Sequence, residues 1–273
     1  MIFLKVIVTV SVVIVLSSIA ERISPRAAGI LSGYPLGSAI TLFFIGFEQG
    51  ADFAGHSALY NVPGLTAMLS FLFIYYQTAR RVRGSRPASL LAASAAGAAV
   101  FFALTALMNH LHLPPAAGIL ITLAAVPLFG YLFRSIPDTV IDRRVKMDLP
   151  ALLVRGGLSA LIVLAITGAA KVSGPGAAGL FSAFPATTFP LILIVHWTYG
   201  AQRAFTVIKN VPSGLLSLVL YSLTLPMVYP RFGIYWGTLI GFAVATVYLL
   251  GLGWYNQHTS NWGREKKSHP ARA

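Results

Sequence analysis

Apolar residues in this chain come in long, nearly uninterrupted runs instead of alternating with polar ones. Each run is about 20 residues long, the length that a helix needs to cross the hydrocarbon core of a membrane. Short polar or basic segments separate the runs. The pattern predicts an all-α polytopic membrane protein with nine transmembrane helices, near residues 2–20, 27–47, 61–79, 88–108, 115–133, 150–170, 176–198, 211–229 and 234–254.

The composition agrees with this prediction. Of the 273 residues, 56% are hydrophobic and only 10% are charged, whereas soluble domains carry roughly 25% charged residues. The net charge of +13 would suggest nucleic-acid binding in a soluble protein, but beside such apolar runs it indicates membrane orientation and no nucleic acid. The chain has no cysteine, which excludes disulfides, thiolate metal sites and cysteine catalysis.

The basic residues predict how the chain is oriented. With nine spans, 17 of the 20 Lys and Arg residues fall on the side that also holds the C-terminus. Positive loops stay in the cytoplasm, so we expect an external N-terminus, a cytoplasmic C-terminus and a place in a bacterial inner membrane. The alternative is that residues 1–20 form a signal peptide, because Ser18-Ile19-Ala20 resembles a cleavage site.

Two segments of the chain resemble each other at an offset of 150 residues. PRAAGILSGYP at 25–35 and PGAAGLFSAFP at 175–185 share six identical positions. The same offset pairs Gly50 with Gly200, and one gap later Asn61-Val62-Pro63 pairs with Asn210-Val211-Pro212. Spans 1–4 would therefore repeat as spans 6–9.

Five spans separate the starts of the two repeats, and an odd number reverses their direction across the membrane. The sequence thus predicts an inverted-topology repeat of 4+1+4 spans, an arrangement that recurs in secondary transporters. The predicted parts are repeat 1 at 1–110, a connector span with a basic inner loop at 111–148, repeat 2 at 149–256, and a cytoplasmic tail at 257–273.

Each repeat carries a proline about a third of the way into its second span. Proline removes a helix hydrogen bond, and the freed backbone groups need partners or a polar cavity inside the membrane. Paired breaks of this kind indicate a transporter site, although they can also be simple kinks between packed helices. The predicted substrate-binding residues are Ser32, Tyr34, Pro35, Ser182, Phe184, Pro185, Thr187 and His196.

A separate set of ionisable residues follows the second span. Glu48 is a candidate proton-coupling residue, because a carboxylate within a membrane is costly. Glu48, Asp52 and His56 are spaced four residues apart and would share one helical face if the span continued outward. An ordinary solvated loop is the simpler interpretation, and we predict no metal site.

Part of the second half resembles a known family. The segments AAGLFSAFP from Ala177 and FPLILIVHWTYGAQRA at 189–204, with Phe189, Pro190, His196 and Arg203 at matching spacing, are similar to the small four-span GlpM-type inner-membrane proteins. The resemblance covers about 90 residues. It implies a small inner-membrane protein of a family in which one member is linked to polysaccharide production, and it implies no substrate or catalytic residue.

The absence of common enzyme motifs reduces the number of candidate functions. No GxxxxGK[ST], GxSxG or HExxH motif occurs, so we expect no enzyme and no cofactor. The leading hypothesis is a gradient-driven secondary transporter of a small solute, embedded in the lipid bilayer. The alternatives are an accessory or scaffold subunit of an envelope polysaccharide or lipid pathway, and an enzyme acting on a lipid-linked substrate. A homodimer or an envelope-complex partner fits either of the first two.

Overall fold

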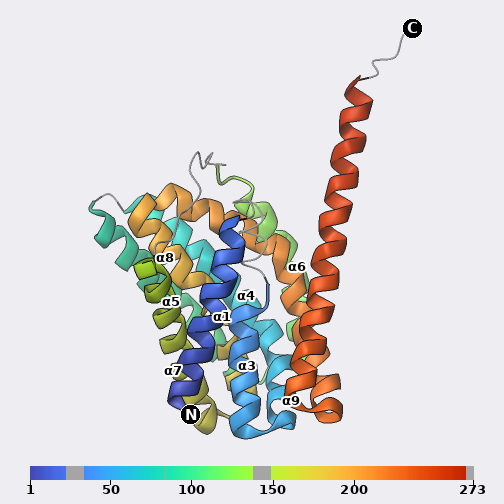
Figure 1. The fold of residues 1–273 in the computed structure, drawn as a ribbon. Coiled ribbons are helices and arrows are strands. Elements are labelled where there is room, and N and C mark those ends of the chain that lie inside the picture. Colours follow the sequence, from blue (N-terminus) through green and yellow to red (C-terminus); the bar gives the residue numbers. More distant parts are fainter. Residues whose placement is uncertain (23–33, 83, 138–148, 269–273) are drawn as a thin grey trace.

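The computed structural model describes residues 1–22, 34–82, 84–137 and 149–268, and side chains within 1–15, 34–82, 84–137 and 149–254. Helices alone make up the regular structure of these residues, which confirms the all-α prediction. The helices are α1 (Ile2–Arg22), α3 (Leu36–Gln49), α4 (Ala51–Arg81), α5 (Arg86–His110), α6 (Pro115–Phe133), α7 (Leu149–Ser182), α8 (Thr188–Tyr199) and α9 (Ala201–Ser268). The start of α1 and the last described residues of α9 lie at opposite ends of the molecule (Figure 1).

Five of these helices are long and apolar enough to cross a membrane, by length and composition: α4, α5, α6, α7 and the part of α9 up to Trp254. The chain is accordingly a multi-pass membrane protein. The helices do not match nine separate spans one for one. The two helices around the predicted breaks, α3 and α8, have only 14 and 12 residues, while α7 and α9 each run through a bend that joins two expected spans.

The bends occur at glycines with positive φ, a conformation that other residues rarely adopt. Gly174 has φ 73° and Gly233 has φ 72°. At Gly233 the chain of α9 folds back on itself, since Tyr229 Oη lies 2.9 Å from Thr238 Oγ1 and Gly241 packs on the ring of Tyr221. The helix α9 is therefore a hairpin of two antiparallel segments.

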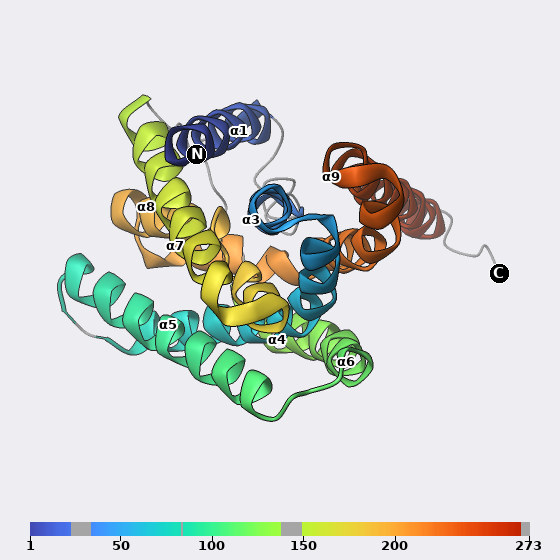
Figure 2. The same cartoon turned by 90° about the horizontal axis from the view of Figure 1, so that it is seen from below.

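Contacts between side chains fix the directions of the other helices. Lys5 of α1 contacts Thr167 of α7, and Val10 contacts Gly156. Residue numbers therefore rise along α1 as they fall along α7, so α1 is antiparallel to the first part of α7. In the bundle seen from below, α5 and α6 lie on one side and α1 and α9 on the other, with α3, α4 and α7 between them (Figure 2). The central helix α4 packs against α3, α5, α6, α7 and α9.

The burial pattern is that of a membrane protein. Of the five long helices, α4 is the least apolar and the most buried, whereas α5 and α6 are strongly apolar and mostly exposed. Large apolar side chains such as Leu91, Phe102, Leu120 and Leu128 lie on the outer surface. In water such a surface would associate or aggregate, but lipid chains solvate it, so the helices contact the bilayer.

Small residues let the inner helices approach closely, as in other membrane bundles. A Cβ added to Gly179 would collide with the carbonyl oxygen of Ser57, and one on Gly118 would meet Pro63 at 2.7 Å. The α4–α7 and α4–α6 interfaces therefore depend on glycine at these positions.

The second expected span ends at a turn. Gly50, with φ 100°, separates α3 from α4, which begins at Ala51, ten residues before the predicted start of the third span. Gly200 makes the same turn with φ 91° between α8 and α9. The second span therefore does not continue outward in one helix, and the condition under which Glu48, Asp52 and His56 would share one helical face is not met. Asp52 and His56 lie in α4 instead of the expected loop.

Candidate functional site

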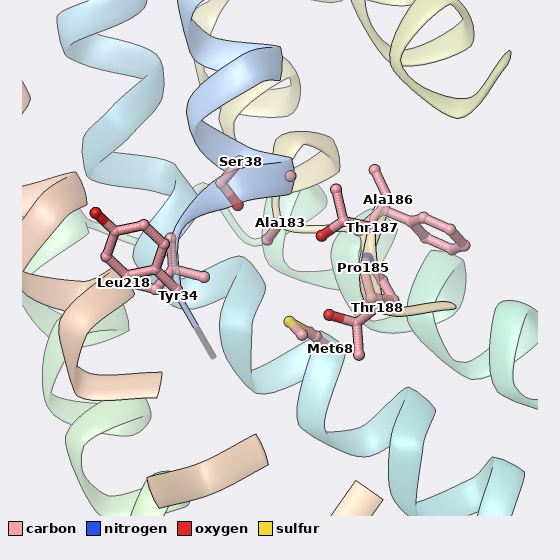
Figure 3. A pocket seen from close by; sticks show the side chains of 11 residues that line it. Tyr34, Ser38, Met68, Ala183, Pro185, Ala186, Thr187, Thr188 and Leu218 are labelled. Carbon is pink, nitrogen blue, oxygen red and sulfur yellow. The ribbon is translucent and has the colours of Figure 1, made fainter. Parts of the chain in front are cut away.

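A small cavity lies where the two proline-containing segments meet (Figure 3). It has room for about one water molecule and is partly open to the outside. Both breaks contribute, together with α4 and the first segment of α9. The lining residues are Tyr34, Gly37, Ser38, Met68, Ala183, Phe184, Pro185, Ala186, Thr187, Thr188 and Leu218.

The prolines explain why the helices break here. Pro35 directly precedes α3, and its carbonyl accepts the first-turn amide of Ala39 at 2.7 Å. Pro185 lies between α7 and α8, and its carbonyl accepts the amide of Phe189 at 2.8 Å. Each proline thus ends one stretch of chain and begins a new short helix, as its fixed φ and missing N–H favour.

A network of uncharged polar side chains lies beside the cavity. Asn61 of α4 donates through Nδ2 to Ser182 Oγ at 2.8 Å and to Ser38 Oγ at 3.3 Å. Asn61 Oδ1 accepts from Ser222 Oγ at 2.8 Å, and Ser38 Oγ donates to the Ser182 carbonyl at 3.0 Å. All four side chains are buried. This network joins α3, α4, α7 and α9 at the level of the breaks.

Four of the predicted binding residues line the cavity: Tyr34, Phe184, Pro185 and Thr187. The Tyr34 hydroxyl lies 2.7 Å from Thr246 Oγ1, and its ring packs on Phe242 with a centroid distance of 5.6 Å. These contacts hold the ring between α3 and the second segment of α9.

The other four predicted residues lie elsewhere. Pro35 is buried next to the cavity, and Ser182 lies in the polar network behind it. His196 is two turns further along α8, where its Nδ1 is 2.7 Å from the hydroxyl of Tyr75. Ser32 lies outside the described residues.

Sequence reasoning missed two kinds of site residue. Asn61 is the centre of the polar network, yet its Asn-Val-Pro motif drew notice only as a match between the two halves. Met68 and Leu218 are ordinary apolar residues of long spans, and no sequence signal separates them from lipid-facing neighbours.

Glu48 lies away from the cavity, in a buried ion pair. Its Oε1 is 2.9 Å from Lys5 Nζ, and Lys5 also donates to Thr167 Oγ1 at 2.6 Å. The side chains of Lys5 and Glu48 are only 5% and 11% exposed. The pair ties α1, α3 and α7 together, and Glu48 Oε2 has no hydrogen-bond partner.

The described residues that line the cavity offer hydroxyl groups and backbone groups but no charged side chain, and among them only Tyr34 is titratable. The space between them is the size of one small group, about that of a water molecule. Among the described residues, no three His, Asp or Glu side chains gather as a metal site would require. No family model, curated protein or solved structure matches the chain.

Proposed function

We propose that this protein is a secondary transporter of a small solute, which binds in the cavity between the two broken segments. The observation that carries the proposal is that Tyr34, at the first break, and Pro185 and Thr187, at the second, line one cavity although 150 residues separate the two breaks. Interrupted helices around a shared site are a recurrent feature of such transporters.

We extend the proposal to the architecture of nine crossings with an inverted repeat. Three observations support it: α9 is a hairpin of two segments, α1 and the first part of α7 run antiparallel, and Gly50 and Gly200 make the same turn with φ/ψ of 100°/161° and 91°/166°. Antiparallel packing of α1 and α7 is expected if they are equivalent helices of opposed repeats.

The orientation belongs to the same proposal. We place the N-terminus outside and the C-terminus in the cytoplasm of a bacterial inner membrane, because of the basic loops. Since the chain has no cysteine, single cysteines introduced at Gly84, at His112 and at Ser260 of the tail report their side by labelling in intact cells. We expect external labelling of His112→Cys only. Labelling that places Gly84 and Ser260 on opposite sides would contradict the repeat.

Transport is tested with purified protein in proteoliposomes and a broad panel of small solutes under an imposed gradient. Leu218→Phe adds bulk to the cavity lining and is expected to reduce flux at least tenfold. Leu220→Phe, two residues along on the exposed face of α9, is the matched control and is expected to leave flux unchanged. If the liposomes show no solute-dependent flux, or if both variants behave alike, the transport proposal fails.

Glu48 is our candidate for proton coupling. Its unpartnered Oε2 and its burial support this role, since a buried carboxylate that exchanges a proton changes the charge balance of the Lys5 pair. Glu48→Gln is expected to abolish the dependence of flux on a pH gradient, whereas downhill exchange of solute continues. Loss of both activities together would contradict a coupling role.

The fully hydrogen-bonded network around Asn61 favours one other candidate, an accessory subunit of an envelope pathway that transports nothing. A satisfied polar core can serve packing alone. This function predicts a stable partner in gentle purification and full pathway output from Leu218→Phe. The transporter predicts the reverse.

A further inference from the structure

Both short helices begin at the cavity. The first residue of α3 is Leu36 and that of α8 is Thr188, and residues beside these starts line the same space. The first N–H groups of a helix have no partner within it, and the dipole adds roughly half a positive charge at this end. Two helix N-termini at one small cavity favour a positive potential there, and none of the described residues that line it is basic.

Thr187 supplies an independent sign of a missing ligand. Its side chain is only 8% exposed, it lines the cavity, and its hydroxyl makes no hydrogen bond to a described residue. Figure 3 shows the Thr187 oxygen on the side of its segment that faces Ser38. The hydroxyls of Ser57 and Ser159 also lack a partner but are fully buried, whereas Thr187 lines the cavity, so a ligand there can accept the hydrogen bond of its hydroxyl.

The carbonyl groups at the break are in a different condition. The C-terminus of α7 also ends at the cavity, but the carbonyl of Phe181 accepts from the Phe184 amide at 2.9 Å and that of Ser182 accepts from Ser38 Oγ at 3.0 Å. The carbonyl of Phe184 accepts from the Ala186 amide at 2.6 Å. These acceptors are thus used within the protein.

Some amides at the helix starts are used as well: that of Leu36 donates to the Tyr34 carbonyl at 2.7 Å and that of Phe189 to the Pro185 carbonyl at 2.8 Å. The amides of Gly37, Ser38 and Thr187 make no hydrogen bond to a described residue, so these three are the donors that a ligand in the cavity can use.

Next to Thr187 there is free space because residue 37 is a glycine and has no side chain. A Cβ placed on Gly37 would lie 3.4 Å from both the amide nitrogen and Oγ1 of Thr187, and 3.5 Å from Ala186 Cβ. These are ordinary contact distances, so an alanine fits without strain, yet it would occupy the position from which a ligand reaches both donors. Gly37 is therefore a gap that a methyl group can close.

From these four observations we propose that the cavity binds a small anionic group, held between the N-termini of α3 and α8 with Thr187 Oγ1 as a donor. The group is either a free monovalent anion or the carboxylate of an organic solute. This inference rests on the proposed transport site and makes its solute an anion, or a molecule with an anionic end.

Binding is measured as a shift of the melting temperature of the purified full chain in detergent. Sodium salts of chloride, nitrate, formate and acetate are titrated against sodium gluconate at constant ionic strength, and a potassium series at fixed anion controls for cations. We expect a saturable stabilisation by at least one of these anions, as mass action requires of a ligand of the folded state. Stabilisation by chloride or nitrate alone would identify the ligand as a free anion, and stabilisation by formate or acetate would identify it as a carboxylate.

Two variants locate the effect. Thr187→Val removes the donor at constant shape, and Gly37→Ala fills the gap, so each should weaken the anion affinity at least tenfold, the loss of one charge-assisted hydrogen bond or more. Thr105→Val in α5 and Gly130→Ala in α6, both remote from the cavity, are the matched controls and should keep the wild-type response.

The outcomes separate this inference from the transport proposal. Anion stabilisation that both cavity variants abolish, without flux of any solute, supports the anion site and contradicts transport. If Gly37→Ala abolishes the flux of a neutral or cationic solute and no anion shifts the melting temperature, transport is supported and the anion site is overturned. An anion response that survives in both variants also overturns it.

Discussion

The protein contains two buried polar sites that differ in charge and in the access to their unpartnered groups. At the Lys5–Glu48 pair, full charges lie in the apolar bundle, and each finds a partner of opposite sign. None of the described residues that line the cavity is charged, yet the Thr187 hydroxyl lacks a partner within the described structure. The first site holds three helices together and keeps its own unpartnered oxygen, Glu48 Oε2, buried in the bundle. The unpartnered hydroxyl of the second site borders a space, and this access marks the place where a solute would bind.

The largest effect is expected at the ion pair. Lys5→Met leaves Glu48 buried without its counter-charge, and breaking a buried pair in this way costs about 3–5 kcal/mol. The double variant Lys5→Met/Glu48→Leu removes both charges and should recover most of that loss. Denaturant unfolding in detergent measures both. A single variant within about 1 kcal/mol of wild type would show that the pair does not hold α1 against α3 and α7.

A smaller loss is expected in the network behind the cavity. Asn61→Ala removes hydrogen bonds to Ser38, Ser182 and Ser222 at once and should cost about 2–3 kcal/mol, because buried polar groups are left unpaired. Asn210→Ala is the matched control, since Asn210 is half-buried and its side chain donates to Thr206 of its own helix. Equal losses in the two unfolding curves would mean that the network contributes little.

This pair of asparagines also shows how far sequence reasoning reached. Asn61 and Asn210 occupy matching motifs in the two halves, and Gly50 and Gly200, at one offset, make the same turn. Local patterns of this kind depend on a few neighbouring residues, so they are legible in the sequence. Which of two equivalent asparagines becomes the centre of a network depends on what packs against it from distant helices, and no local pattern reports that.

The same limit applies to Asp52, His56 and His196. The polar residues Asp52 and His56 suggested a loop, but they lie on the exposed side of α4 while Ala54 and Ala58 are buried on the other. His196 follows the start of α8 by eight residues, which at 1.5 Å per residue is about 12 Å. Spacing along the chain could not reveal that it lies beyond the cavity and pairs with Tyr75.

An intermediate effect is expected at that second pair. Tyr75→Phe removes the hydroxyl that lies 2.7 Å from His196 Nδ1 and should lower the free energy of unfolding by about 1 kcal/mol, the usual net value of a buried hydrogen bond. The KM of any transported solute should stay within twofold of wild type. A KM that rises tenfold without a loss of stability would return His196 to the binding site and remove the distinction between the two regions.

The smallest effect on stability, and the only one of opposite sign, is expected at the cavity. In gluconate, Thr187→Val replaces an unpaired buried hydroxyl with a methyl group and should raise the free energy of unfolding by up to about 1 kcal/mol. Thr105 is also buried, but its hydroxyl donates to the carbonyls of Phe101 and Phe102 in its own helix. Thr105→Val should therefore lower the free energy of unfolding by about 0.5–1 kcal/mol.

The opposite signs of the stability changes expected for Thr187→Val and Thr105→Val test whether the cavity is built for a ligand. Binding sites are often kept less stable than they could be, because their polar groups are arranged for a ligand and not for the protein alone. If Thr187→Val destabilises the protein in gluconate as much as Thr105→Val does, the Thr187 hydroxyl already has a partner when no anion is present. The cavity would then have no unsatisfied hydroxyl to offer a solute.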